Sequence, residues 1–180
     1  MIPSIILAQG LLQKYLKKEE NLRHCQEVGL AMKALATYYK EDKELWQTIG
    51  LLHDIDIEIF GEDISKHTIV GEDILKKEEV DKNIIDIIKS HNNATGQKRS
   101  SKIEHCLYSA DSLTGLIHAY VLMRPDKDIQ KAEVSSILKK FKDKTFAKGV
   151  NREVISSAKE TLGIELREFI EIVLKGMQEE

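Results

Sequence analysis

The chain has 180 residues, a formal net charge of −3 and a hydrophobic content of 42%, which is enough for one well-buried domain but not for a second. The low net charge argues against a broad nucleic-acid-binding surface. Two cysteines without C-x-x-C spacing exclude a disulfide framework and favour a reducing cytoplasm. The apolar run at residues 5–7 is too short to span a membrane and has no basic leader before it.

Apolar residues recur at helical spacing along the whole chain, and no alternating strand pattern rises above noise. Gly and Pro are rare, and Pro125 is expected to end the longest helix. The sequence therefore predicts an all-α fold. The predicted helices cover about residues 6–16, 22–39, 43–52, 65–77, 81–90 and 101–123, followed by three shorter ones at 134–141, 152–162 and 165–177.

The third predicted helix ends on an adjacent imidazole and carboxylate, His53 and Asp54. Ile49 and Leu52 place one face of that helix against a core, and His53 follows Ile49 by four residues. A buried charge without a partner costs several kcal/mol, so both side chains need one. A metal ion would serve both. The alternative is a solvated His–Asp pair at a helix end, and the dipeptide alone does not decide between them.

Three further histidines and one aspartate also fall on apolar helical stripes: His24, His67, His91 and Asp111. If each of them were buried separately, each would need its own hydrogen-bond or charge partner. One metal centre where several helices converge would be a partner for them all. The remaining histidines differ. His105 has polar helical neighbours and is expected at the surface, and His118 is expected to have a packing or supporting role.

In chain order, these residues resemble the H…HD…D signature of the HD-domain metal-dependent phosphohydrolases. Segments 66–75 and 90–92 resemble the parts of that family that carry two additional histidines, and the tail at 141–152 is similar to that of HDIG-type hydrolases. The resemblance implies a compact helical HD-domain fold over residues 1–180, with a core at 21–124 and a helical extension at 125–180.

The resemblance also implies a ligand set for one or two divalent ions. His24, His53, Asp54 and Asp111 would hold one ion, and His67 and His91 would hold a second, with Asp54 bridging the two. Such nitrogen and oxygen ligands favour Fe, Mn, Co, Ni or Zn. Asp54 and His53 are the predicted catalytic residues, acting with a metal-activated water.

The implied activity is hydrolysis of a small phosphorylated substrate, a nucleotide or a related phosphoester. Lys98, Arg99 and Arg124 are candidates to bind its phosphate, although each can equally be an ordinary surface charge. The basic stretch 139–152 is either a solvated face or a phosphate-binding lid. Two other functions remain open: a metal-stabilised binding or signalling module, and a di-iron oxygenase. A homo-oligomer is possible, because the apolar first helix suits a core or a dimer contact equally.

One departure from the family pattern concerns the residues that follow the His–Asp pair. Where many relatives continue HD-I-G-K, this chain has Asp56 and Glu58 and no lysine. These acids are either solvated, or one of them orients a metal ligand or acts as a general base.

Overall fold

The computed structural model describes residues 1–61 and 63–179, and within them every regular element is a helix, which confirms the all-α prediction. The α-helices are α1 (Ile5–Tyr15), α2 (Glu19–Tyr39), α3 (Lys43–Leu52), α4 (Ile69–Lys77), α5 (Lys82–Ser90), α6 (Lys102–Met123), α7 (Val134–Lys142), α8 (Arg152–Ser156), α9 (Ala158–Leu162) and α10 (Leu166–Met177). Short 3-10 turns lie at Ile64–Lys66, Asn93–Thr95 and Ile129–Lys131.

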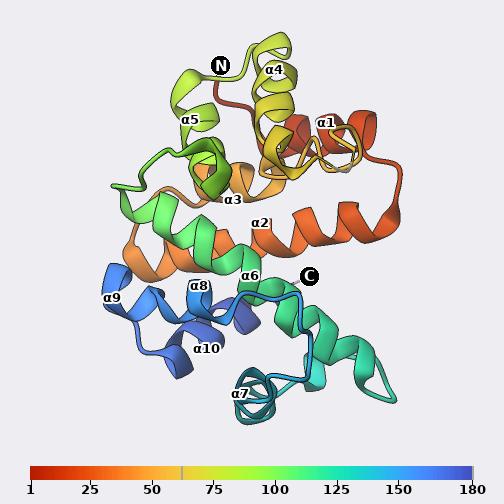
Figure 1. The fold of residues 1–180 in the computed structure, drawn as a ribbon, viewed down its shortest axis with the longest axis vertical. Coiled ribbons are helices and arrows are strands. Elements are labelled where there is room, and N and C mark those ends of the chain that lie inside the picture. The colour runs from red at the N-terminus through yellow and green to blue at the C-terminus, as the bar shows by residue number, and fades with distance from the viewer. Residues whose placement is uncertain (62, 180) are drawn as a thin grey trace.

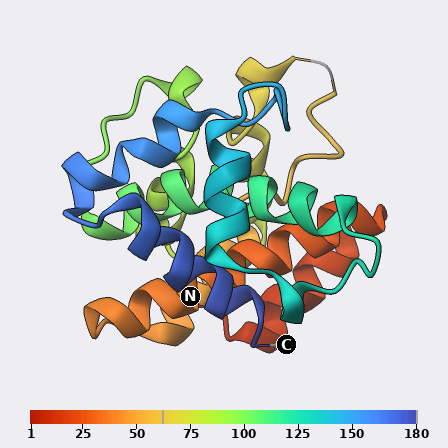
Figure 2. The same ribbon diagram turned by 90° about the horizontal axis from the view of Figure 1, so that it is seen from below.

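The two longest helices, α2 and α6, cross the middle of the molecule (Figure 1). Helices α1, α3, α4 and α5 lie on one side of this pair, and α7 to α10 lie on the other. Helix α10 packs on both α2 and α6, and seen from below α7 and α10 lie in front of them (Figure 2). One continuous apolar core runs through both sides and includes Met32, Leu113 and Phe169.

Helix α3 folds back on α2 through a tight turn and a close backbone contact. Lys40 ends α2 in the left-handed conformation at φ 59°, and the Asp42 carboxylate caps α3 by accepting from the N–H groups of Glu44 and Leu45. Farther along, Gly50 lies against Gly29, where an added Cβ would be 2.9 Å from the Gly29 nitrogen. The small residues let the backbones touch, and this fixes the position of the α3 end that carries His53.

Two of the predicted helices are interrupted. The segment predicted as one helix over 65–77 is a 3-10 turn followed by α4, and the two are separated by His67 and Thr68. Thr68 has φ 66°, in the left-handed region that non-glycine residues rarely adopt, so His67 lies in a turn and not on a helical face. The predicted helix over 152–162 is likewise divided into α8 and α9 around Ser157. No helix in residues 1–61 and 63–179 has the length and apolar character that crossing a bilayer requires.

Candidate metal centre

The structure brings together all six residues that the sequence predicts as ligands. His24 comes from α2 and Asp111 from the middle of α6, and the rest stand at helix ends or in turns. His53 is the C-cap of α3 and His91 the C-cap of α5, while His67 precedes α4. Helix ends converging on the central pair of helices therefore build the cluster.

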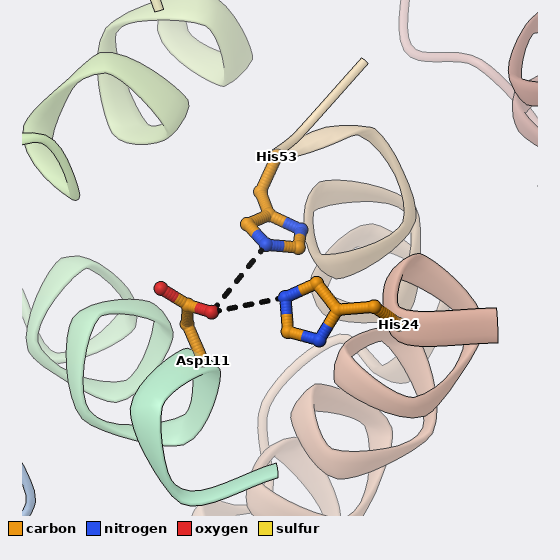
Figure 3. A group of neighbouring side chains, drawn as sticks. All are labelled: His24, His53 and Asp111. Carbon is orange, nitrogen blue, oxygen red and sulfur yellow. Dashed lines mark hydrogen bonds and ion pairs between the residues drawn. The ribbon is translucent and has the colours of Figure 1, made fainter. Parts of the chain in front are cut away.

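The part of the cluster shown in Figure 3 contains His24, His53 and Asp111. Asp111 Oδ1 lies 3.1 Å from His24 Nε2 and 3.8 Å from His53 Nε2. These three residues present ligand atoms that all lie within 4.8 Å of one another, and so do His53, Asp54 and His91. Both groups are therefore able to hold a metal ion.

The carboxylate of Asp54 lies between two pairs of imidazoles. Its Oδ2 is 3.8 Å from His24 Nε2 and 3.5 Å from His53 Nε2. Its Oδ1 is 3.2 Å from His67 Nε2 and 3.4 Å from His91 Nε2. Each oxygen thus faces its own pair of ring nitrogens, which is the arrangement expected of a carboxylate shared by two ions.

Backbone carbonyls orient two of the rings. His53 Nδ1 donates to the Gly50 carbonyl at 2.8 Å, and His91 Nδ1 donates to the Ile88 carbonyl at 2.5 Å. With the proton on Nδ1, each Nε2 presents a lone pair to the cluster. His53 Nε2 is buried and has no hydrogen-bond partner. An orphaned buried nitrogen surrounded by carboxylates and imidazoles suits a cation, so these residues fit the predicted metal.

The two acids that depart from the family pattern have defined hydrogen-bond partners, and for Asp56 the interpretation as a solvated acid is wrong. Asp56 is fully buried, and its Oδ1 accepts from His67 Nδ1 at 2.9 Å. Glu58 accepts from the backbone N–H groups of Lys17 and Lys18 and from Asn21, at the start of α2. Asp56 orients a candidate ligand, which is the alternative that the sequence left open, whereas Glu58 acts on the fold.

The centre opens to solvent on one side. The side chains of His24 and Asp111 are 27% and 31% exposed, whereas those of His53 and His91 are 0% and 4% exposed. The more exposed ligands therefore come from α2 and α6, and the more buried ones come from the ends of α3 and α5.

The histidines and carboxylates of the cluster shift one another's pKa values. Burial lowers the pKa of His53, but the carboxylates of Asp54 and Asp111 raise it more, to about 9. Burial also lowers the pKa of His67, and its contacts with Asp54 and Asp56 raise it to about 10. Conversely, burial raises the pKa of Asp54, and the facing imidazoles lower it well below its ordinary value. The ion-free centre therefore holds protons that a bound metal must displace.

Ion binding is accordingly expected to strengthen as pH rises from about 7 toward 9. Both histidine pKa values lie above 6.5, so protonation stabilises the ion-free fold, and that stabilisation is lost as pH rises through about 9 to 10. Since ligation needs the neutral ring, the apparent affinity should increase about tenfold per pH unit for each proton displaced. Competition with a chromophoric chelator, buffered at several pH values, measures this. An affinity that does not change with pH would contradict it.

Of the three predicted phosphate-binding residues, Arg99 contacts two of the elements that carry candidate ligands. Its guanidinium stacks 3.6 Å from the ring centroid of Tyr108, one helical turn before Asp111. It donates to the Ser90 carbonyl at 2.5 Å and to Asn93 Oδ1 at 2.8 Å, in the turn that carries His91. The cation is thus held rigidly between two of the segments that supply candidate ligands.

The other two residues differ from Arg99 in their surroundings. Arg124 makes two bonds of 2.9 Å with the Asp126 carboxylate, and Lys98 is exposed. Their predicted role in substrate binding stays a prediction.

The basic stretch 139–152 is organised around Arg152. Its guanidinium donates to the carbonyls of Phe141 at 2.8 Å and of Asp143 at 2.9 Å, and it makes a further bond to the carbonyl of Phe146. Arg152 therefore holds the connection between α7 and α8 in shape. Lys142 and Lys144 line a pocket of about 510 Å³ beside it, and none of the six candidate ligands lines that pocket.

The two remaining histidines lie outside the cluster. His118 Nδ1 is 2.7 Å from Glu27 Oε1, so it links α6 to α2. His105 is partly exposed, near the start of α6. Sequence reasoning missed Asp56 as a definite part of the site, because its partner His67 is eleven residues away and the contact depends on the turn at Thr68.

Comparisons with known proteins agree with this geometry. The profile of the HD domain family matches residues 21–116. Ribonuclease Y of Oleidesulfovibrio alaskensis is 31% identical over 114 residues, which is 63% of this chain and 22% of that protein. The chain therefore spans about a fifth of the length of this relative. Among solved structures there is no match.

Proposed function

Because the chain belongs to the HD domain family, a superfamily of metal-dependent phosphohydrolases, we propose that it hydrolyses a small phosphorylated substrate, a nucleotide or a related phosphoester. The observation that carries this proposal is the carboxylate of Asp54, whose two oxygens face separate pairs of imidazoles. A bridging carboxylate with histidines on both sides suits two divalent ions that act on one phosphoryl group.

In this proposal each protein group has a defined task. A divalent ion bound here supplies a water whose pKa falls from about 15.7 toward 7. His24 and Asp111 line the open side and admit the phosphoryl group between α2 and α6. His53 and Asp54, whose side chains are the more buried ones, would hold an ion. Arg99 supplies a fixed positive charge to the substrate phosphate.

The deciding experiment combines elemental analysis with a phosphate-release screen. Purified protein should contain one or two transition-metal ions per chain and release phosphate from some nucleotides or small phosphoesters in Mn, Co, Ni or Mg buffers. Cleavage of a short single-stranded RNA, followed by gel electrophoresis, belongs beside the screen, because the partial similarity to Ribonuclease Y favours a phosphodiester as the second candidate. Ions bound at full stoichiometry without turnover of any substrate would favour the binding-module alternative. Oxygen consumption with iron bound would favour the oxygenase.

Replacing Arg99 by Ala is expected to raise KM for a phosphorylated substrate by about 10- to 100-fold, because a charge-assisted hydrogen bond contributes about 1.5–3 kcal/mol. Steady-state kinetics with the best substrate of the screen measure this. The matched control is Arg124→Ala, which removes the same side chain from a site where Asp126 already occupies the guanidinium. A KM that stays unchanged in Arg99→Ala would remove Arg99 from the substrate site.

A further inference from the structure

Asp56 makes hydrogen bonds to three donors from one short segment. In addition to His67 Nδ1, its Oδ2 accepts from the backbone N–H of Thr68 at 2.7 Å and from that of Gly71 at 2.8 Å. A fully buried carboxylate is tolerated only when donors surround it, and here one imidazole and two backbone groups do so. The same side chain therefore determines where α4 begins and how the His67 ring is turned.

The space around Asp56 is matched to a carboxylate. A Cβ added at Gly71 would be 3.2 Å from Asp56 Oδ2 and 3.3 Å from its Cγ, so any side chain there would push the carboxylate away. Gly71 therefore leaves the room that the Asp56 carboxylate occupies.

The contact with Asp56 fixes which nitrogen of His67 faces the centre. Because Oδ1 accepts from Nδ1–H, the Nε2 lone pair points toward His91 Nε2, 3.0 Å away. His91 also has its proton on Nδ1, since that atom lies against the Ile88 carbonyl. Two facing lone pairs at this distance repel each other unless a proton or a cation lies between them.

We propose that Asp56 is a positioning residue for the second ion, the one that His67 and His91 would hold. It selects the tautomer of His67 and aims Nε2, so its loss converts a two-ion centre into a one-ion centre while the ion at His24, His53 and Asp111 is retained. This inference rests on the proposed function, because it presupposes the metal centre. It adds that occupancy of the second position depends on a residue that touches no ion.

The test is Asp56→Asn, which keeps the shape of the side chain. The amide oxygen is expected to keep the bonds to Thr68 and Gly71, which turns the amide N–H₂ toward His67 Nδ1. His67 must then carry its proton on Nε2, where it blocks ligation. The second ion should bind about 10- to 100-fold more weakly, as is typical when a partner of a metal-bound histidine is lost. Calorimetric titration with Mn or Zn and elemental analysis measure the two sites separately.

Two further variants keep the result interpretable if Asp56→Asn folds poorly. Glu58→Gln is the same chemical change two residues away, at a side chain that contacts the start of α2, and should leave both ions bound. Gly71→Ala displaces the carboxylate without changing its charge and should weaken the second ion selectively, with the helical circular dichroism unchanged.

Three results would overturn the inference: equal affinity for the second ion in wild type and Asp56→Asn, parallel weakening of both ions, or a wild type that hydrolyses phosphoesters with one ion. All three leave the proposed function standing. A wild type that binds no ion would instead contradict the proposed function itself.

Discussion

Replacing Asp54 by Ala is expected to remove both bound ions and to reduce phosphate release to the level of buffer. The reason is geometric, since each Asp54 oxygen faces its own pair of imidazoles, whereas Asp111 faces imidazoles through Oδ1 alone. Without the bridge, four neighbouring imidazoles lose the negative charge that favours a cation among them. Elemental analysis after dialysis and the phosphate-release assay provide the two readouts.

The contrast with Asp111→Ala makes this prediction specific. Among the histidines of the centre, the Asp111 carboxylate pairs with His24 and His53, so its loss should release one ion and leave the second in place, still with little activity. Phosphate release that survives in Asp54→Ala would mean that the catalytic site lies elsewhere in the chain. Retention of both ions there would mean that Asp54 does not bridge.

The sequence was sufficient for the parts of this site that depend on helical periodicity. His24 and Asp111 lie on helices whose apolar residues recur every three or four positions, so their inward direction follows from the pattern. His53 and His91 were placed correctly because each directly follows a strongly amphipathic helix. These elements were predictable because local spacing alone determines which side faces the core.

The periodic pattern failed where a long-range hydrogen bond overrides it. The spacing predicts that His67 lies on a helical stripe. In the structure Asp56 accepts from the N–H groups of Thr68 and Gly71, and α4 begins only at Ile69, two residues after His67. Arg152 was expected at a solvated or phosphate-binding face, yet backbone carbonyls of its own loop surround it. In both cases a charged side chain, Asp56 or Arg152, is hydrogen-bonded to groups within the protein. Sequence composition cannot distinguish such a side chain from one that is solvated at the surface.

The second large effect is expected from Gly50→Ala, which should destabilise the fold and disturb the centre together. An added Cβ would lie 2.7 Å from the Val28 carbonyl oxygen and 2.8 Å from the Gly29 Cα, so the backbones of α2 and α3 must separate. Forced packing of this kind costs about 3 kcal/mol or more, which lowers the Tm of a chain of this size by about 6–12 °C. Thermal unfolding followed by circular dichroism measures it.

The matched control is Gly10→Ala in α1, where an added Cβ meets nothing within 4 Å. There the substitution should stabilise the protein by up to about 1 kcal/mol, because alanine favours a helix more than glycine does.

The effect of Gly50→Ala on metal binding follows from the close contact of Gly50 with Val28 and Gly29. The Gly50 carbonyl accepts from His53 Nδ1, so moving α3 turns the ring that presents the orphaned Nε2. If Gly50→Ala lowered the Tm but bound ions with wild-type affinity, the α2–α3 contact would support the fold without positioning the centre.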